Sequence, residues 1–218
     1  METDLLVRKK SLKLQQKNSF YLMNFLKKLF KTYQESSKEK KANEQEVYLS
    51  LDDSFVHHFI NKGGKFLYCT SINEVSKNLK NILQENNWRK ITCTDFDLLK
   101  ITEKIDISVQ NHSSESVPFF TSCEHLIADK GEILFSSNQL GSHKLASLSK
   151  HFIVYATTSQ LVKNTGEGLT GIKTHFSGNI PTNISSIKNY TFEVEDDNFL
   201  SYGNNNTKDL YLLLFEDL

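Results

Sequence analysis

The chain has 218 residues, of which 38% are hydrophobic, and its 26 basic side chains balance 26 acidic ones. This length suits one domain with a tail, and the composition excludes a wholly disordered chain. No apolar run approaches the ~18 residues that a membrane span needs, and the polar start does not resemble a secretory signal. We therefore expect a cytoplasmic protein without an integral membrane segment.

The charges are unevenly distributed along the chain. Residues 1–41 hold 11 Lys/Arg and 4 Asp/Glu, whereas the rest holds 15 and 22. A net negative main part repels phosphate backbones, so we expect no nucleic-acid partner. We predict a basic N-terminal extension with an amphipathic helix over 1–45 and an α/β domain over 46–218.

The helix predicted within the extension begins near Ser19. Its apolar residues recur at spacings of three and four: Phe20, Met23, Leu26, Phe30 and Tyr33. This apolar stripe has three interpretations, which are packing on the domain core, pairing with a partner helix, or lying on an anionic membrane surface. Core or partner packing is the commoner case.

Helices and strands alternate in the first half of the main domain. Ser50 is a predicted N-cap of a helix that ends at Gly63-Gly64, and Ser71 with Glu74 has the spacing of a capping box. Between and after these helices the pattern predicts strands at 66–69, 90–93 and 105–109, with a short helix at 95–101.

The second half is richer in β-branched residues and turns. Two strands, 126–128 and 133–135, flank a tight turn at Asp129-Lys130-Gly131. A buried strand is predicted at 151–156, a helix from Ser159 to about Phe176, and a central strand in the apolar run 210–215. These elements predict the α/β class, with a mixed, mainly parallel sheet, helices on both faces and a small antiparallel insertion.

Several common kinds of site are missing from the sequence. Cys69, Cys93 and Cys123 form no CxxC motif, and the seven histidines form no HxH or HExxH motif, so we predict no metal and no cofactor. The glycines at 166, 168 and 171 spell GxGxxG, but the preceding residues are predicted to be helical rather than a strand. Close helix packing or a turn is therefore the preferred interpretation.

Two groups of residues are candidates for chemistry. Ser136, Ser137, Asn138 and Gln139 follow a buried strand, where open α/β sheets bind ligands, although a polar turn would look the same. Three carboxylates could act as acid, base or nucleophile, although exposed turn charges would also look the same: Glu124, Asp129 and Glu132.

The segment 123–175 resembles the LUD domain (lactate utilisation protein C-like, LutC/YkgG) family. Ala128-Asp129-Lys130-Gly131 is similar to the family's Ala-Glu/Asp-x-Gly segment, and 148–155 is similar to its Leu-Pro-x-x-His-Ile-Val-Val strand, with Ser149 in place of proline. Near the C-terminus, Thr207, Asp209 and Leu210 match a family motif whose Gly-Pro-Ser is replaced by three asparagines.

This resemblance implies a three-layer fold of the NagB/RpiA/CoA-transferase-like type. It also implies a non-cluster subunit that works beside iron–sulfur oxidoreductase subunits in oxidising L-lactate to pyruvate. The polar crevice implied by the resemblance combines the segment 129–139 with Thr207-Lys208-Asp209.

The leading hypothesis is an anion-binding LUD-domain protein of lactate or organic-acid utilisation. In it, Lys144 or Lys208 supplies positive charge, and hydrogen bonds come from Ser136, Ser137, Asn138 and Thr207, with Gln139 and Asp209 beside them. One alternative is a stand-alone CoA-transferase or isomerase-like enzyme that uses a carboxylate. Another is an interaction protein recruited by its basic N-terminal helix.

Overall fold

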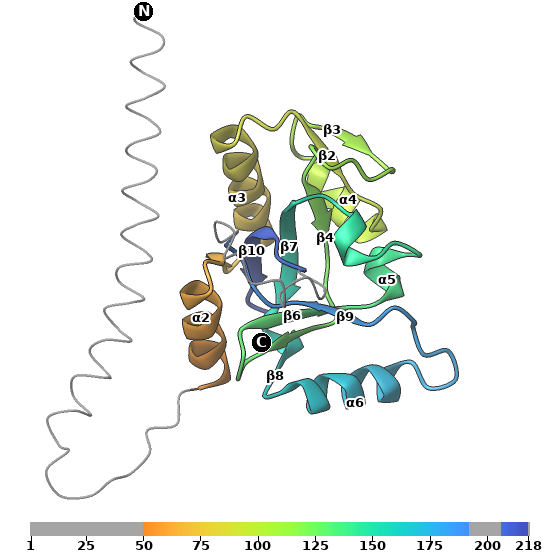
Figure 1. The fold of residues 1–218 in the computed structure, drawn as a ribbon. Coiled ribbons are helices and arrows are strands. Elements are labelled where there is room, and N and C mark those ends of the chain that lie inside the picture. Colours follow the sequence, from red (N-terminus) through yellow and green to blue (C-terminus); the bar gives the residue numbers. More distant parts are fainter. Residues whose placement is uncertain (1–49, 192–205, 218) are drawn as a thin grey trace, which may run out of the picture. The chain divides into compact units, whose positions relative to one another are not determined.

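The computed structural model describes residues 50–191 and 206–217 (Figure 1). The chain divides into two units, Met1–Leu49 and Ser50–Leu218. The predicted amphipathic helix of the extension therefore lies outside the described residues. None of the helices in the described part is long and apolar enough to cross a membrane.

The helix starts predicted at Ser50 and Ser71 are confirmed by their caps. The α-helices of the described part are α2 (Leu51–Asn61), α3 (Ile72–Glu85), α4 (Phe96–Thr102), α5 (Ser137–Leu140) and α6 (Thr165–His175), with single 3-10 turns η1 (Leu145–Ser147) and η2 (Thr158–Gln160). The side chain of Ser50 accepts a hydrogen bond from the N–H of Asp53, and that of Ser71 accepts one from Glu74. Each bond satisfies an N–H group that the helix itself leaves unpaired.

Six strands form the main sheet, in the order β1-β10-β7-β4-β2-β3, and every neighbouring pair is parallel. They are β1 (Lys65–Cys69), β10 (Asp209–Phe215), β7 (His151–Thr157), β4 (Phe119–Thr121), β2 (Lys90–Thr92) and β3 (Ser108–Gln110). Strands β7 and β10 pair along their full length, from His151 with Asp209 to Thr157 with Phe215. The apolar run 210–215 is thus an interior strand, as predicted.

The predicted antiparallel insertion is the core of a second, four-stranded sheet with the order β8-β5-β6-β9. Its strands are β8 (Leu161–Val162), β5 (His125–Ile127), β6 (Glu132–Phe135) and β9 (Ser185–Ile187). The β5–β6 turn needs glycine, because Gly131 has a φ of 60° and an added Cβ would lie 2.4 Å from the backbone nitrogen of Phe59.

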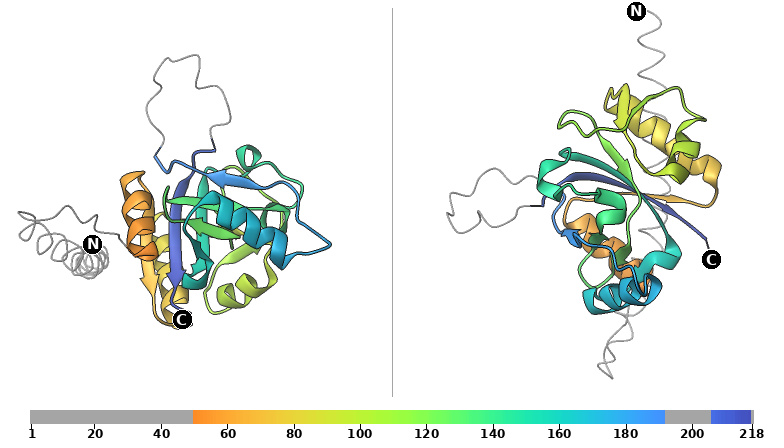
Figure 2. Two further views of the ribbon diagram at one scale, coloured as in Figure 1. Left: turned by 90° about the horizontal axis from the view of Figure 1, so that it is seen from below. Right: turned by 90° about the vertical axis from the view of Figure 1, so that its right-hand side faces the viewer.

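Helices and the second sheet cover the two faces of the main sheet. On one face, α3 and α4 pack on a core that includes Leu79, Phe120 and Leu213. On the other face, Phe135 of the second sheet packs against Phe152 of β7, with ring centroids 6.1 Å apart. Helix α6 covers the second sheet, and Figure 2 (right) shows α3 and α6 on opposite sides of the main sheet. The observed architecture is the mainly parallel α/β fold that the sequence predicted.

Part of the helix predicted from Ser159 to Phe176 is wrong. Leu161 and Val162 form strand β8, which pairs with β5, and the helix begins only after the N-cap Asn164. Two adjacent apolar residues fit the periodicity of a helix as well as that of a strand. Pairing with β5, a contact distant in sequence, makes this segment a strand. The strand predicted at 105–109 is shorter and shifted, since β3 covers Ser108–Gln110. Strands β4 and β9 and helix α5 were not predicted.

Candidate acid–base site at the carboxyl edge of the main sheet

All six strands of the main sheet end at one edge, which we call the carboxyl edge, and begin at the opposite amino edge. After β2 the chain continues outward to β3, whereas after β4 it continues the other way to β7. The carboxyl edge between β2 and β4 is therefore the topological switch point, where open α/β sheets commonly bind ligands. Asp95 follows β2, and Ser122 and Glu124 follow β4.

Glu124 is a carboxylate at this edge whose side-chain hydrogen bonds within the described residues all fall on one oxygen. Its Oε1 atom accepts hydrogen bonds from Ser136 Oγ at 2.5 Å, Asn138 Nδ2 at 3.0 Å and Gln139 Nε2 at 3.1 Å. No hydrogen bond to Oε2 comes from residues 50–191 or 206–217. The Glu124 side chain is only partly buried.

Local structure explains why these four residues meet. Glu124 and Ser136 stand at the open end of the β5–β6 hairpin, where the N–H of Glu124 donates to Leu134 O at 2.8 Å. Ser136 then caps α5, and the side chain of Gln139 accepts from the N–H of Ser136 at 2.9 Å, which completes a capping box. The same serine and glutamine that start the helix therefore also orient Glu124.

Neighbouring polar groups extend the site along the carboxyl edge. Ser122 Oγ donates to Asp95 Oδ2 at 2.7 Å, which links the ends of β4 and β2. Gln160 Nε2 donates to the carbonyl oxygen of Cys123 at 2.6 Å. A hollow of about 550 Å³, with lining that includes Cys93 and His112, opens where β2 and β3 end.

Asp217 lies past the end of β10 and shows the same kind of coordination. Ser159 Oγ donates to its carboxylate at 2.7 Å, and Thr158 Oγ1 does so at 2.7 Å. Slight desolvation acts to raise the pKa of the exposed Asp217, but these hydrogen bonds outweigh it and hold the pKa well below its usual range. Hydrogen bonds from neutral hydroxyl groups thus stabilise the charged form of this carboxylate.

The other two predicted carboxylates lie elsewhere. Asp129 is exposed in the β5–β6 turn, and Glu132 is buried at the start of β6, so both stand at the closed end of the hairpin, away from Glu124. Burial, together with the charge of Glu132, raises the pKa of Tyr190 well above its ordinary value. The structure therefore brings only Glu124 together with predicted ligand-binding residues.

The predicted ligand-binding residues divide into separate groups. Asn138 and Gln139 join Ser136 at Glu124, while Ser137 instead accepts from the N–H of Thr182 at 3.0 Å. Lys144 is exposed at the start of η1.

Thr207, Lys208 and Asp209 lie at the amino edge, because they precede β10 or begin it, whereas Glu124 and Asn138 lie where the parallel strands end. Thr207 is buried. Lys208 is 3% exposed, and its Nζ donates to Leu148 O at 3.1 Å. Burial lowers the pKa of Lys208 to about 8.

Asp209 is bound by two basic side chains at the amino edge. Lys65 Nζ lies 2.5 Å from Oδ1, and His151 Nδ1 lies 3.1 Å from Oδ2. The single crevice implied by the resemblance is thus not assembled from these two segments. The reason is geometric, since residues that follow one parallel strand and residues that begin another lie at opposite ends of the sheet.

Three observations concern motifs and residue types raised by the sequence. Strand β8 does precede the glycines of α6, so the objection to a strand–turn–helix context is wrong. The packing interpretation nevertheless agrees with the contacts, because an added Cβ at Gly171 would lie 2.9 Å from His125 Nε2. Burial raises the pKa of the Cys69 and Cys93 thiols to about 11.

In the described ranges, no group of three or more His, Cys, Asp or Glu side chains is placed to hold a metal ion.

Sequence reasoning missed Ser122, Asp95 and Gln160 at the carboxyl edge. A signal existed for Asp95, which is the N-cap of α4 and accepts from the N–H groups of Asp97 and Leu98. No local signal existed for Gln160, because its contact with Cys123 spans 37 positions of the chain.

No family model and no curated protein matches the chain. Among solved structures, the fold is similar to a crystal structure of a DUF162 family protein from Deinococcus radiodurans, with a TM-score of 0.55 and 13% identity. The similarity covers 78% of this chain and 99% of the other. DUF162 is the LUD domain family, so the fold of the described part is similar to that of a LUD-domain protein.

Proposed function

We propose that the protein acts on a small organic acid at the carboxyl edge of the main sheet, with Glu124 as the group that takes and returns a proton. The observation that carries this proposal is the coordination of Glu124, whose Oε1 accepts from Ser136, Asn138 and Gln139. Three donors on one oxygen orient the other oxygen toward a substrate, which is what an acid–base residue requires.

The substrate class rests on the resemblance to lactate-utilisation proteins and on the similarity of fold. A hollow of about 550 Å³ lies at the same edge beside Cys93 and His112, a volume suited to a small molecule, although Glu124 itself does not line it. Anion binding through Lys144 or Lys208 is less favoured, because Lys144 is exposed to solvent and the ammonium of Lys208 is buried against Leu148 O.

A partner belongs to the same proposal. Oxidation of lactate to pyruvate breaks the O–H and C2–H bonds and releases two protons and two electrons. In this proposal Glu124 takes the hydroxyl proton, the proton from C2 passes to solvent, and the two electrons pass to iron–sulfur oxidoreductase subunits, as the resemblance to the LUD family implies.

The capacity of Glu124 to transfer a proton can be tested without a partner or an electron acceptor, on the methyl protons of pyruvate, which the adjacent keto group makes acidic. A base that removes a proton from the methyl group of pyruvate forms the enolate, and return of a deuteron from D₂O labels the methyl group. We expect the full chain to accelerate this exchange, as measured by loss of the methyl proton signal in NMR spectra. Glu124→Gln should slow it about 100-fold, since the amide cannot accept the proton.

Two further variants discriminate between interpretations. Glu103→Gln replaces an exposed carboxylate at the end of α4 and should exchange at the rate of the unmodified protein. Loss of exchange in Asp129→Asn with full exchange in Glu124→Gln would move the base to the hairpin turn and contradict the proposal. Absence of acceleration by the unmodified chain would also contradict it.

A further inference from the structure

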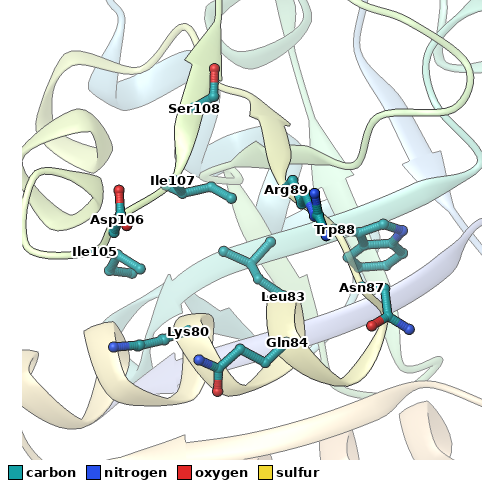
Figure 3. A pocket seen from close by; sticks show the side chains of 10 residues that line it. All are labelled: Lys80, Leu83, Gln84, Asn87, Trp88, Arg89, Ile105, Asp106, Ile107 and Ser108. Carbon is teal, nitrogen blue, oxygen red and sulfur yellow. The ribbon is translucent and has the colours of Figure 1, made fainter.

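A second hollow, of about 520 Å³, opens at the amino edge of the main sheet (Figure 3). It lies between the last turns of α3 and the segments that lead into β2 and β3. Its volume falls in the range of small-molecule sites. None of its lining residues belongs to the Glu124 site, which is at the opposite edge.

The floor of this hollow is part of the hydrophobic core. Leu83 and Ile105 are buried members of the core cluster under α3, and Trp88 and Ile107 pack against the same cluster. Figure 3 shows Leu83 and Ile107 pointing into the space between the walls. Because core residues form this floor before a ligand binds, little conformational entropy is lost in ordering it.

Cationic side chains stand on the rim. Lys80 and Arg89 both line the hollow and are exposed. Within the described residues, neither side chain makes a hydrogen bond or ion pair, whereas Lys65 and Lys150 each pair with an acid. The rim also holds Asp106, which leaves the two cations in excess over one acid.

The residue types at this place are rare in the chain. Of its 26 basic residues only Arg8 and Arg89 are arginines, and Trp88 is its one tryptophan. The structure places Trp88 and Arg89, adjacent in sequence, on the wall of one hollow. A guanidinium binds a carboxylate through two parallel hydrogen bonds, which an ammonium does not. Tryptophan and arginine are also the residues most enriched where binding energy concentrates.

Neighbouring side chains hold the indole ring in place. The ring centroid of Trp88 lies 5.1 Å from that of His151 and 6.3 Å from that of Tyr211. His151 is in turn bound to Asp209, whose other oxygen binds Lys65. Because the ammonium of Lys65 pairs with Asp209, this nearby carboxylate opposes an incoming anion less than an unpaired one would.

We propose that the hollow beside Trp88 binds a small carboxylate with a planar apolar body. The carboxylate binds Arg89, and the apolar body lies on Leu83, Ile107 and Trp88. Lys80 stands across the hollow from Arg89 and adds positive charge to the rim (Figure 3). The site is independent of the proposed function of Glu124, since the two lie at opposite edges of the sheet.

Benzoate is a suitable probe for this site, and Trp88 is a built-in reporter because no second tryptophan is present. We expect saturable quenching or enhancement of tryptophan fluorescence when benzoate is added to the full chain, and the same dissociation constant from calorimetry. Benzamide, which is neutral and of the same shape, should bind at least tenfold more weakly. Equal binding of both compounds would overturn the proposal.

Substitutions of arginine locate the carboxylate. Arg89→Gln should weaken benzoate binding at least tenfold, and Arg89→Lys should fall between Arg89→Gln and the unmodified chain, because it keeps the charge and loses the two-pronged geometry. Lys100→Gln, a cation paired with Asp97 on α4, is the matched control and should bind normally.

Glu124→Gln separates this proposal from the proposed function. It should bind benzoate with unchanged affinity and an unchanged fluorescence response. If Glu124→Gln abolishes binding while Arg89→Gln leaves it intact, the carboxylate binds at the carboxyl edge and the inference is wrong. Circular dichroism of each variant checks that the exposed substitutions leave the fold intact.

Discussion

The two edges of the main sheet treat their carboxylates in opposite ways. At the carboxyl edge, Glu124 and Asp217 accept hydrogen bonds from neutral hydroxyl and amide groups. At the amino edge, Asp209 is bound by Lys65 and His151. Neutral donors orient a carboxylate without cancelling its charge, whereas basic partners cancel it. This difference supports the proposed proton transfer at the first edge and the proposed binding of an anion at the second.

The largest effect on this comparison is expected from Ser136→Ala at the carboxyl edge. Ser136 is fully buried, donates to Glu124 and accepts from the N–H of Asn138, so its loss removes two hydrogen bonds and the cap of α5. We expect a loss of about 2 kcal/mol in the free energy of unfolding. Urea denaturation measures it.

The neighbouring serine supplies the control for that experiment. Ser137→Ala removes only the hydrogen bond from the N–H of Thr182 and should cost less than half as much. Similar losses of unfolding free energy in both variants would show that the Ser136–Glu124 hydrogen bond adds no stability. The neutral donors of the carboxyl edge would then not stabilise its carboxylate as proposed.

A pH-dependent effect is expected from Lys208 at the amino edge. Burial lowers its pKa to about 8 in the folded protein, against about 10.4 in an unfolded chain. Unfolding therefore takes up a proton between these values, and the contribution of Lys208 to stability rises with pH across this window. Below about pH 7, Lys208 is protonated in both the folded and the unfolded protein, so the folded state bears the full cost of burying the ammonium.

Lys208→Met isolates this contribution from other titrating groups. Between pH 7 and 9.5 the unmodified protein should gain about 2 kcal/mol of unfolding free energy relative to the variant. Urea denaturation at both pH values gives the difference. Lys188→Met, which removes an exposed lysine, should show no such change. A pH-independent difference for Lys208→Met would mean that the ammonium is not desolvated.

The smallest effect is expected from Asp209→Asn. The Lys65–Asp209 pair is partly exposed, so its loss should cost about 1 kcal/mol or less at low salt. The cost should shrink further in 0.5 M NaCl because salt screens exposed charges. Denaturation at the two salt concentrations measures this. A salt-independent loss would show that packing, rather than charge, holds the amino edge together.

Much of the fold was predictable because its signals are local. The caps at Ser50, Ser71 and Asp95 begin the predicted helices, since each side chain accepts hydrogen bonds from N–H groups only two or three residues away. The turn at Gly131 was likewise visible, because a positive φ demands glycine. Strand β8 was mistaken for helix because two residues carry too little periodicity and only its pairing with β5 defines it.

The candidate site was predictable in part. Glu124, Ser136, Asn138 and Gln139 were all singled out, and they meet because one hairpin joins them. Thr207 and Asp209 were expected in the same crevice, because a sequence does not show to which edge of a sheet each strand end points. Gln160, Trp88 and Arg89 acquire their surroundings from residues distant in the chain, so no spacing identified them.

The sequence by itself determined the capped helices, the antiparallel hairpin and the buried central strand, because capping, turn geometry and hydrophobic periodicity act over a few residues. The tertiary structure alone decided which polar side chains share an edge of the sheet. The physical reason is the parallel pairing of strands from distant parts of the chain. It places Glu124 among neutral donors at one edge, and Asp209 between two basic groups at the other.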